Sequence, residues 1–155
     1  MQRLLFLDID GVLHADHEQQ LARLPVLEQY LVQMPDVRIV ISSTWREDFS
    51  LAELQELFSP ACQHQIIDVT PILSIGYDQG GRQREIEQFL QHPVWSGSAW
   101  LALDDWRSFF DADCSQLLWI DPATGFQPEH GEALIHWYTS TQQPNDTAPH
   151  STDQG

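Results

Sequence analysis

Five short apolar runs alternate with segments of helical periodicity along this chain. The runs cover residues 3–8, 37–42, 65–69, 99–103 and 117–120. Between and after them, apolar residues recur every three or four positions over 25–34, 51–58, 82–91 and 128–138, which predicts helices. The runs are apolar on both faces, as in strands that helices cover from both sides. The alternation predicts an α/β domain of three layers, with a doubly wound, Rossmann-like parallel sheet in the middle.

The chain has the size and composition of one folded domain. Its 155 residues are 42% hydrophobic, which is enough for a substantial core. We expect a single domain over residues 1–139. Residues 140–155 are polar, contain proline and lack periodicity, which predicts a disordered C-terminal tail.

The charge balance is strongly acidic. Seven basic residues, all of them arginine, stand against 23 acidic ones, a formal net charge of −16. Binding to a nucleic acid backbone requires a basic face, which this chain has few residues to build. An anionic substrate would therefore be held by a metal ion and a few well-placed arginines.

The sequence contains no run of eighteen apolar residues, so no membrane span is expected. Cys62 and Cys114 lack metal-binding spacing, which predicts reduced thiols in a cytoplasmic protein.

Polar side chains follow three of the predicted strands at the point where each strand ends. They are Asp8 and Asp10 after the first, Ser42 and Ser43 after the second, and Asp104 and Asp105 after the fourth. Parallel strands end at one edge of a sheet, where such folds bind ligands. Four carboxylates gathered there need a cation to stay ionised, and oxygen ligands favour Mg²⁺. The sequence thus predicts a magnesium site suited to phosphoryl transfer, with Asp8 as nucleophile and Asp10 as proton donor.

Other polar residues near these motifs have ordinary structural explanations. Thr44 with Glu47, and Ser50 with Glu53, have the spacing of a helix-capping box, so Thr44 and Ser50 are expected to cap helices. His14 and His17 lie in the loop after the first strand, beside the site; they could touch substrate, although an exposed loop histidine is the more common case.

The segment FLDIDGVL, residues 6–13, resembles the first motif of the haloacid dehalogenase (HAD) superfamily, hhhhDxDGxL. Further motifs of the superfamily follow in order: VIS with STWR, then GRQREI, then LALDD. The resemblance covers roughly residues 3–138. Within the superfamily, the set is similar to a small branch without a cap domain, the HAD domain of Swiss-army-knife RNA repair proteins.

The resemblance implies a role for each matched residue. Asp8 would attack phosphorus, and Asp10 would protonate the leaving oxygen and then activate the hydrolytic water. Ser42 would hydrogen-bond the phosphoryl group, and Arg82 would neutralise its charge. The Mg²⁺ ligands would be Asp8, Asp104, Asp105 and the backbone carbonyl of Asp10.

Two of these assignments leave alternatives open. The serine that binds phosphate could be Ser42 or Ser43; Ser42 is preferred because it directly ends the apolar run. The phosphate-stabilising cation could be Arg82, Arg84 or Arg46, and the RxxEI spacing favours Arg82.

The resemblance implies a Mg²⁺-dependent phosphatase, a phosphoric monoester hydrolase that acts through an aspartyl-phosphate. The stretches between Asp10 and Ser42 and between Arg82 and Asp104 are too short for a cap domain. An open site suits a large phosphorylated substrate, such as a nucleic acid end or a phosphoprotein, although the acidic charge opposes nucleic acid. The alternatives are a polynucleotide end phosphatase in nucleic acid repair and a non-catalytic, metal-binding regulatory module. The sequence leaves the oligomeric state open.

Overall fold

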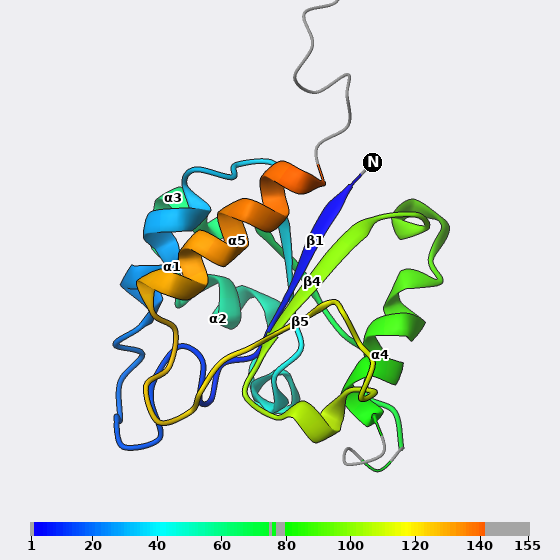
Figure 1. The fold of residues 1–155 in the computed structure, drawn as a ribbon, viewed down its shortest axis with the longest axis horizontal. Helices are drawn as coiled ribbons and strands as arrows, with labels where there is room; N and C mark the ends of the chain where they lie inside the picture. Colours follow the sequence, from blue (N-terminus) through cyan, green and yellow to red (C-terminus); the bar gives the residue numbers. More distant parts are fainter. Residues whose placement is uncertain (1, 75, 77–79, 142–155) are drawn as a thin grey trace, which may run out of the picture.

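Five parallel strands form a single sheet in the computed structural model, which describes residues 2–74, 76 and 80–141 (Figure 1). The strands are β1 (Arg3–Leu7), β2 (Arg38–Ile41), β3 (Ile66–Val69), β4 (Ala99–Asp104) and β5 (Leu117–Trp119). They lie in the order β3-β2-β1-β4-β5, and every neighbouring pair is parallel. The predicted doubly wound α/β sheet is confirmed, with β1 at its centre.

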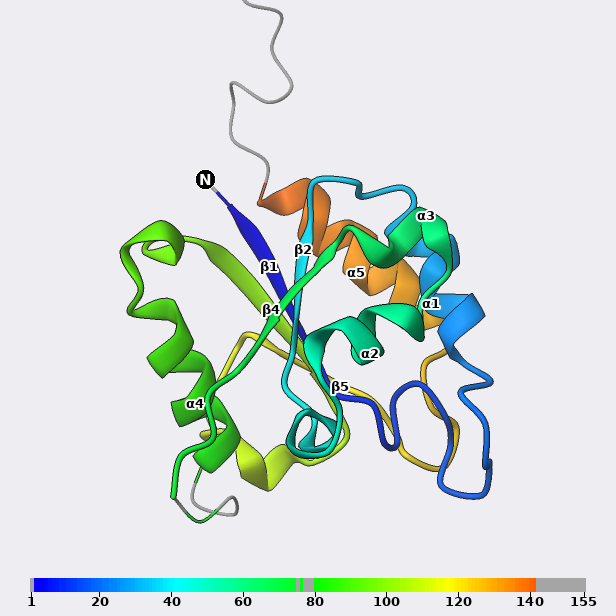
Figure 2. The ribbon, with the colours of Figure 1, turned by 180° about the vertical axis from the view of Figure 1, so that it is seen from behind.

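Helices cover both faces of the sheet and complete the three layers. They are α1 (Leu24–Leu31), α2 (Leu51–Glu56), α3 (Pro60–Gln63), α4 (Gly81–Leu90) and α5 (Pro128–Ser140), with short 3-10 turns η1 (Thr44–Glu47), η3 (Pro93–Trp95) and η4 (Arg107–Phe109). Helices α1, α2, α3 and α5 lie on one side of the sheet and α4 on the other (Figures 1 and 2). Helices α1 and α5 pack closely because Gly131 has no side chain to collide with the Tyr30 ring.

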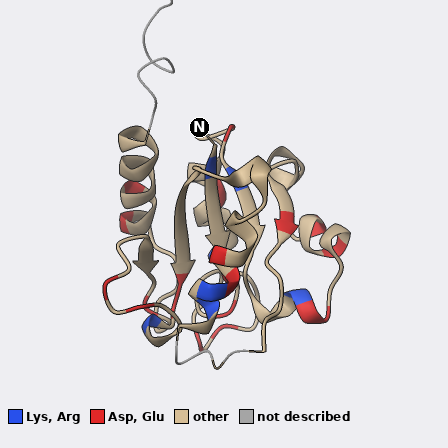
Figure 3. Ribbon diagram, turned by 90° about the vertical axis from the view of Figure 1, so that its right-hand side faces the viewer, with Lys and Arg blue, Asp and Glu red and all other residues tan. Residues whose placement is uncertain are grey.

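The carboxyl ends of the strands meet at one edge because all the strands run in the same direction. Figure 3 shows acidic residues in the loops that follow the arrowheads at this edge. Within the described residues no cap domain interrupts the fold. The chain between Asp10 and Ser42 forms a loop, α1 and β2, and the chain between Arg82 and Asp104 forms α4, η3 and β4. In the described part of the chain, this edge of the sheet therefore carries loops and short turns instead of a cap domain.

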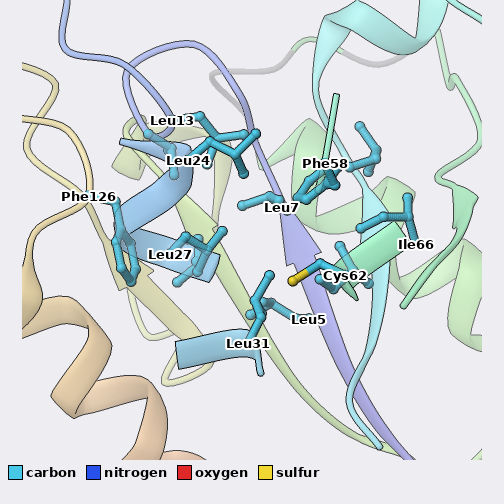
Figure 4. Close-up of a cluster of buried hydrophobic side chains, with 14 of the residues drawn as sticks. Leu5, Leu7, Leu13, Leu24, Leu27, Leu31, Phe58, Cys62, Ile66 and Phe126 are labelled. Atoms are coloured by element: carbon cyan, nitrogen blue, oxygen red, sulfur yellow. The ribbon is translucent and has the colours of Figure 1, made fainter. Parts of the chain in front are cut away.

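The core consists of two apolar clusters, one on each face of the sheet. Alternate residues of β1 supply both: Leu5 and Leu7 join the larger cluster, beneath α1, α2, α3 and α5 (Figure 4), whereas Leu4 and Phe6 join the smaller one, beneath α4. All four are fully buried. Burial on both faces explains why the strand is apolar from Leu4 to Leu7, and the strand ends directly before Asp8.

Most of the predicted helices and strands are confirmed, but one of the two predicted helix caps is wrong. Ser50 and Glu53 form the expected capping box at the start of α2. Thr44 is instead the first residue of η1, and Ser43 caps this turn because its side chain accepts a hydrogen bond from the Trp45 backbone N–H. Helix α5 continues to Ser140.

The predicted C-terminal tail falls largely on residues 142–155, outside the described residues, so it stays a prediction. No helix in the described part of the chain combines the length and the apolar character needed to cross a bilayer.

Candidate active site

The register of the central strands brings three polar residues side by side. Leu7 pairs with Ile41 of β2 and with Leu103 of β4, so Asp8 emerges between Ser42 and Asp104. Backbone hydrogen bonds continue the ladder past the strand ends: the Ser42 N–H donates to the Leu7 carbonyl at 2.9 Å, and the Asp8 N–H donates to the Leu103 carbonyl at 3.0 Å. The predicted convergence of the three strand ends at this edge is confirmed. Backbone hydrogen bonds on both sides of β1 hold the strand ends in place.

Three carboxylates form a compact cluster there. Asp8, Asp104 and Asp105 each offer an oxygen, and these oxygens lie within 4.8 Å of one another. Asp104 is fully buried and Asp8 is 5% exposed. Burial is the largest cause that raises the pKa of Asp8 and of Asp104 to about 7, and repulsion from Asp8 adds to the effect at Asp104. Burial likewise raises the pKa of Asp105 to about 6.

Such a cluster has the properties of a site for a hard divalent cation. All its donors are carboxylate oxygens, the type that Mg²⁺ prefers. The Oδ1 atom of Asp105 is buried and has no hydrogen-bond partner among the described residues, so it is available to a cation. When all three carboxylates are ionised, their three negative charges and the one positive charge of Arg82 leave a local charge of −2. The residues present therefore fit Mg²⁺.

Gly11 allows Asp105 to enter this cluster. Its φ of +77° is a conformation that residues with side chains rarely adopt. A Cβ atom at this position would also collide with the Asp105 carboxylate. The DxDG motif thus needs glycine both for the turn and for the close approach of the loop that carries Asp105.

Arg82 is the arginine that reaches the cluster. It lies in the first turn of α4, and its Nη1 atom is 2.7 Å from Asp104 Oδ2 and 3.4 Å from Asp8 Oδ1. The guanidinium also lies over the Phe109 ring, 5.1 Å from its centroid. The side chain is almost fully buried, so its position is well defined. A substrate phosphate beside Asp8 would meet a cation that is already in place.

The other two candidate arginines lie elsewhere. Arg84 pairs with Glu87 and Asp111 at the protein surface. Arg46 is buried, with its guanidinium in an ion pair with Glu85 at 2.9 Å. Their positions favour Arg82 among the three.

Arg46 and Glu85 tie together the segments that carry Ser42 and Arg82. Arg46 donates from Nε to the Thr70 carbonyl at 2.9 Å and from Nη1 to the Ser43 carbonyl at 2.8 Å. Glu85 lies one helical turn after Arg82 and accepts a second hydrogen bond from the Leu73 N–H. Both side chains are 1% exposed. Sequence reasoning missed this pair, although both residues are letters of the motifs STWR and RxxEI.

The two serines at the end of β2 also differ in their roles. Ser43 uses its hydroxyl to cap η1. Ser42 is buried immediately beside Asp8 on the sheet, and its position favours it as the phosphate-binding serine.

Asp10 lies apart from the carboxylate cluster. Its side chain is 58% exposed, and its Oδ1 atom contacts two ring nitrogens: Trp45 Nε1 at 3.1 Å and His14 Nε2 at 2.9 Å. The exposed carboxyl is thus separate from the proposed metal ligands. The His14 side chain is only 17% exposed, so the expectation of an exposed loop histidine is wrong. Its spacing of four residues from Asp10 is the one sequence signal that could have indicated the contact.

The parallel sheet and the polar residues at its strand ends are those of a haloacid dehalogenase (HAD) domain. The chain belongs to the family described as the HAD domain in Swiss Army Knife RNA repair proteins, whose model matches residues 4–130, well over half of the chain. No curated protein and no solved structure matched the chain significantly. HAD domains are generally phosphohydrolases, so membership of the family favours a hydrolase of the phosphatase type.

Proposed function

We propose that the protein is a Mg²⁺-dependent phosphoric monoester hydrolase that forms an aspartyl-phosphate on Asp8. The observation that carries this proposal is the meeting of Asp8, Asp104 and Asp105 with Arg82 at the carboxyl edge of the sheet. A cytoplasmic location is proposed with it, supported by the two cysteines, Cys62 and Cys114, which are free thiols.

Asp8 is the nucleophile of the proposed reaction. Its Oδ1 atom accepts a hydrogen bond from the Ile9 N–H at 2.9 Å, which fixes the rotation of the carboxylate. One carboxylate oxygen bonds to phosphorus while the bond from phosphorus to the leaving oxygen breaks, and Asp10 gives its proton to that oxygen. Water then attacks phosphorus and passes a proton to Asp10 while the bond between phosphorus and the Asp8 oxygen breaks, so that phosphate leaves and the Asp8 carboxylate is restored. Two steps thus return every group to its starting state.

Arg82 and Ser42 act on the charge of the phosphoryl group during these steps. The guanidinium is held by Asp8 and Asp104 before substrate arrives, so little reorganisation is required when negative charge builds on the phosphoryl oxygens. The Ser42 hydroxyl would donate to one of those oxygens from the neighbouring strand end.

A bound Mg²⁺ would be held by the carboxylates of Asp8, Asp104 and Asp105 and by the backbone carbonyl of Asp10. It would supply positive charge that lets an anionic carboxylate approach an anionic phosphate. The raised pKa values at the cluster support this assignment, because a group of carboxylates that binds protons tightly also gains most from a metal ion.

Steady-state hydrolysis of p-nitrophenyl phosphate with and without Mg²⁺ tests the proposal. Asp8→Asn should abolish turnover, and Arg82→Met should lower kcat/KM by about a hundredfold or more. Arg84→Met is the matched control, since Arg84 pairs with surface carboxylates, and it should stay within about twofold of the wild type. Turnover that survives Asp8→Asn would contradict the mechanism.

A second candidate is a phosphatase that acts on the phosphorylated end of RNA. The family description supports it, and so does the lack of a cap domain among the described residues, since no such domain would stand in the way of a long chain. The net charge of −16 opposes it. Oligonucleotides with 3′ or 5′ phosphates should be hydrolysed in preference to small esters, with a marked salt dependence, if this candidate is right. An absence of turnover on every phosphate ester tried with Mg²⁺ would favour a non-catalytic, metal-binding module.

A further inference from the structure

The Asp10 carboxyl is largely exposed, yet two rings hold it on one side. The Trp45 indole N–H donates to Asp10 Oδ1 at 3.1 Å, and His14 Nε2 lies 2.9 Å from the same oxygen. Both contacts fall on Oδ1, so neither ring engages Oδ2. We propose that His14 and Trp45 are positioning residues that hold Asp10 so that its second oxygen faces the leaving group. This inference depends on the proposed function, in which Asp10 exchanges a proton with that group.

Contacts on the far side of the ring fix the orientation of His14. Its Nδ1 atom lies 2.7 Å from the Ala15 carbonyl, which can only accept, so Nδ1 donates to it, and in the imidazolium form Nε2 also carries a proton and donates it to Asp10 Oδ1. Ala15 is fully buried, and its N–H donates to Glu18 Oε1 at 2.7 Å. Arg23 in turn pairs with Glu18 at 3.2 Å. This series of contacts links Arg23 through Glu18 and Ala15 to the His14 ring, and it favours one orientation of the ring.

Trp45 approaches Asp10 from another part of the chain. It lies within η1, which Ser43 caps immediately after β2. The indole ring packs against the Phe49 ring, with the centroids 5.4 Å apart, and borders the larger core cluster. The N–H that reaches Asp10 therefore projects from a ring that cannot move freely. Two loops separated by 35 residues along the chain meet at one carboxylate oxygen.

This arrangement matters because an exposed aspartate would otherwise rotate among several side-chain conformations. General acid catalysis contributes about 10²–10⁴-fold to a rate, and it depends on the acid lying within hydrogen-bond reach of the leaving atom. Loss of the two holding contacts should therefore reduce proton donation while leaving the nucleophile Asp8 and the cation Arg82 in place. The loss in kcat/KM, which reports the steps up to departure of the leaving group, should therefore be large only with leaving groups that need a proton.

The experiment compares two substrates that share a phosphoryl group. The leaving group of p-nitrophenyl phosphate departs as a stable anion, whereas that of an alkyl phosphate such as glycerol phosphate requires protonation. Trp45→Phe keeps the ring and removes only the N–H, and His14→Ala removes the second contact. His14→Gln is the conservative variant, since its amide nitrogen can reach the position of Nε2. The matched controls are His17→Ala, an exposed histidine of the same loop, and Trp137→Phe on α5.

We expect Trp45→Phe and His14→Ala each to lower kcat/KM for the alkyl phosphate about tenfold or more, and for p-nitrophenyl phosphate by less than about threefold. Both variants should also show a burst of p-nitrophenolate, because Asp10 must later activate the water that releases Asp8. His14→Gln should recover most of the loss, and both controls should match the wild type. Melting temperatures measured in parallel identify any variant that is unfolded, and the remaining ones carry the comparison.

Equal losses on both substrates, or no loss on either, would overturn the positioning role. A wild-type protein that hydrolyses neither substrate with Mg²⁺ would overturn the proposed function and this inference with it. The two failures are distinguishable because only the second is seen in the wild type.

Discussion

Asparagine at position 8 removes one charge from the buried carboxylate cluster while keeping nearly the same side-chain volume. At pH 8 the metal-free variant should be more stable than the metal-free wild type, although it lacks the proposed nucleophile. The cause is the environment of Asp8, which is 5% exposed and lies within 4.8 Å of the oxygens of Asp104 and Asp105. Burial raises the Asp8 pKa from 3.8 to about 7. The folded protein therefore holds this proton more tightly than the unfolded chain does.

The magnitude follows from that difference in pKa. One pKa unit corresponds to about 1.4 kcal/mol, so ionising Asp8 at pH 8 lowers the free energy of unfolding by about 4 kcal/mol. A raised folded-state pKa gives stability that is complete below pH 4 and is lost as the pH rises through about 7. The Asp8→Asn variant avoids this loss, and we expect a gain of about 2–4 kcal/mol at pH 8, or about 5–10 °C in melting temperature. At pH 5 the gain should fall to less than half of that value.

Urea or thermal denaturation in EDTA, at pH 5 and at pH 8, measures the effect. Asp121→Asn is the control, because Asp121 is exposed and lies outside the cluster, and its stability should follow that of the wild type. Added Mg²⁺ should stabilise the wild type more than Asp8→Asn and so reduce the difference between them. An Asp8→Asn variant no more stable than the wild type at pH 8, or equally stabilised at both pH values, would refute the reasoning from burial.

Three further changes test other parts of the site. Gly11→Ala should cost about 1–3 kcal/mol in urea denaturation, since φ is +77° and the new methyl group would meet the Asp105 carboxylate; an unchanged midpoint would contradict that crowding. Arg46→Met should cost about 3–5 kcal/mol because it leaves Glu85 as a buried, unbalanced charge, and the double variant with Glu85→Met should lose less than the sum of the single losses. Additive losses would show that the two side chains act independently. Asp105→Asn should weaken Mg²⁺ binding about tenfold or more by calorimetry, while Asp121→Asn should stay within about twofold; equal affinities would remove Asp105 from the ligand set.

The sheet and most of its helices could be predicted because local signals and tertiary packing agree. The segment RLLFL is apolar at every position after its first residue and is followed by a polar loop, and so short an apolar run is typical of a strand that is buried on both faces. Ser50 and Glu53 form their box within four residues. The cap of η1 was misassigned because Ser43 and Thr44 are adjacent and both suit a cap, and the backbone angles decide between them. Helix α3 has four residues, too few to show a period.

The site was predictable where a residue's role depends on its place at a strand end. Asp8 and Asp104 reach the same edge because parallel strands in this order must bring them there. The contacts that support the site were not predictable, since Arg46 meets Glu85 39 residues further along the chain. Trp45 likewise meets Asp10 across 35 residues. Such pairings depend on how loops cross above the sheet, which no local pattern in a single sequence records.

The buried pair of Arg46 and Glu85 also bears on how this protein can change over evolutionary time. Replacing either residue alone breaks the buried ion pair and destabilises the fold, so a lineage that loses one passes through a less stable ancestor. The two positions should therefore be inherited as a unit and replaced together when they are replaced at all. Surface residues such as Arg84 carry no such linkage and are free to drift. Natural variation at positions 46 and 85 should thus be correlated.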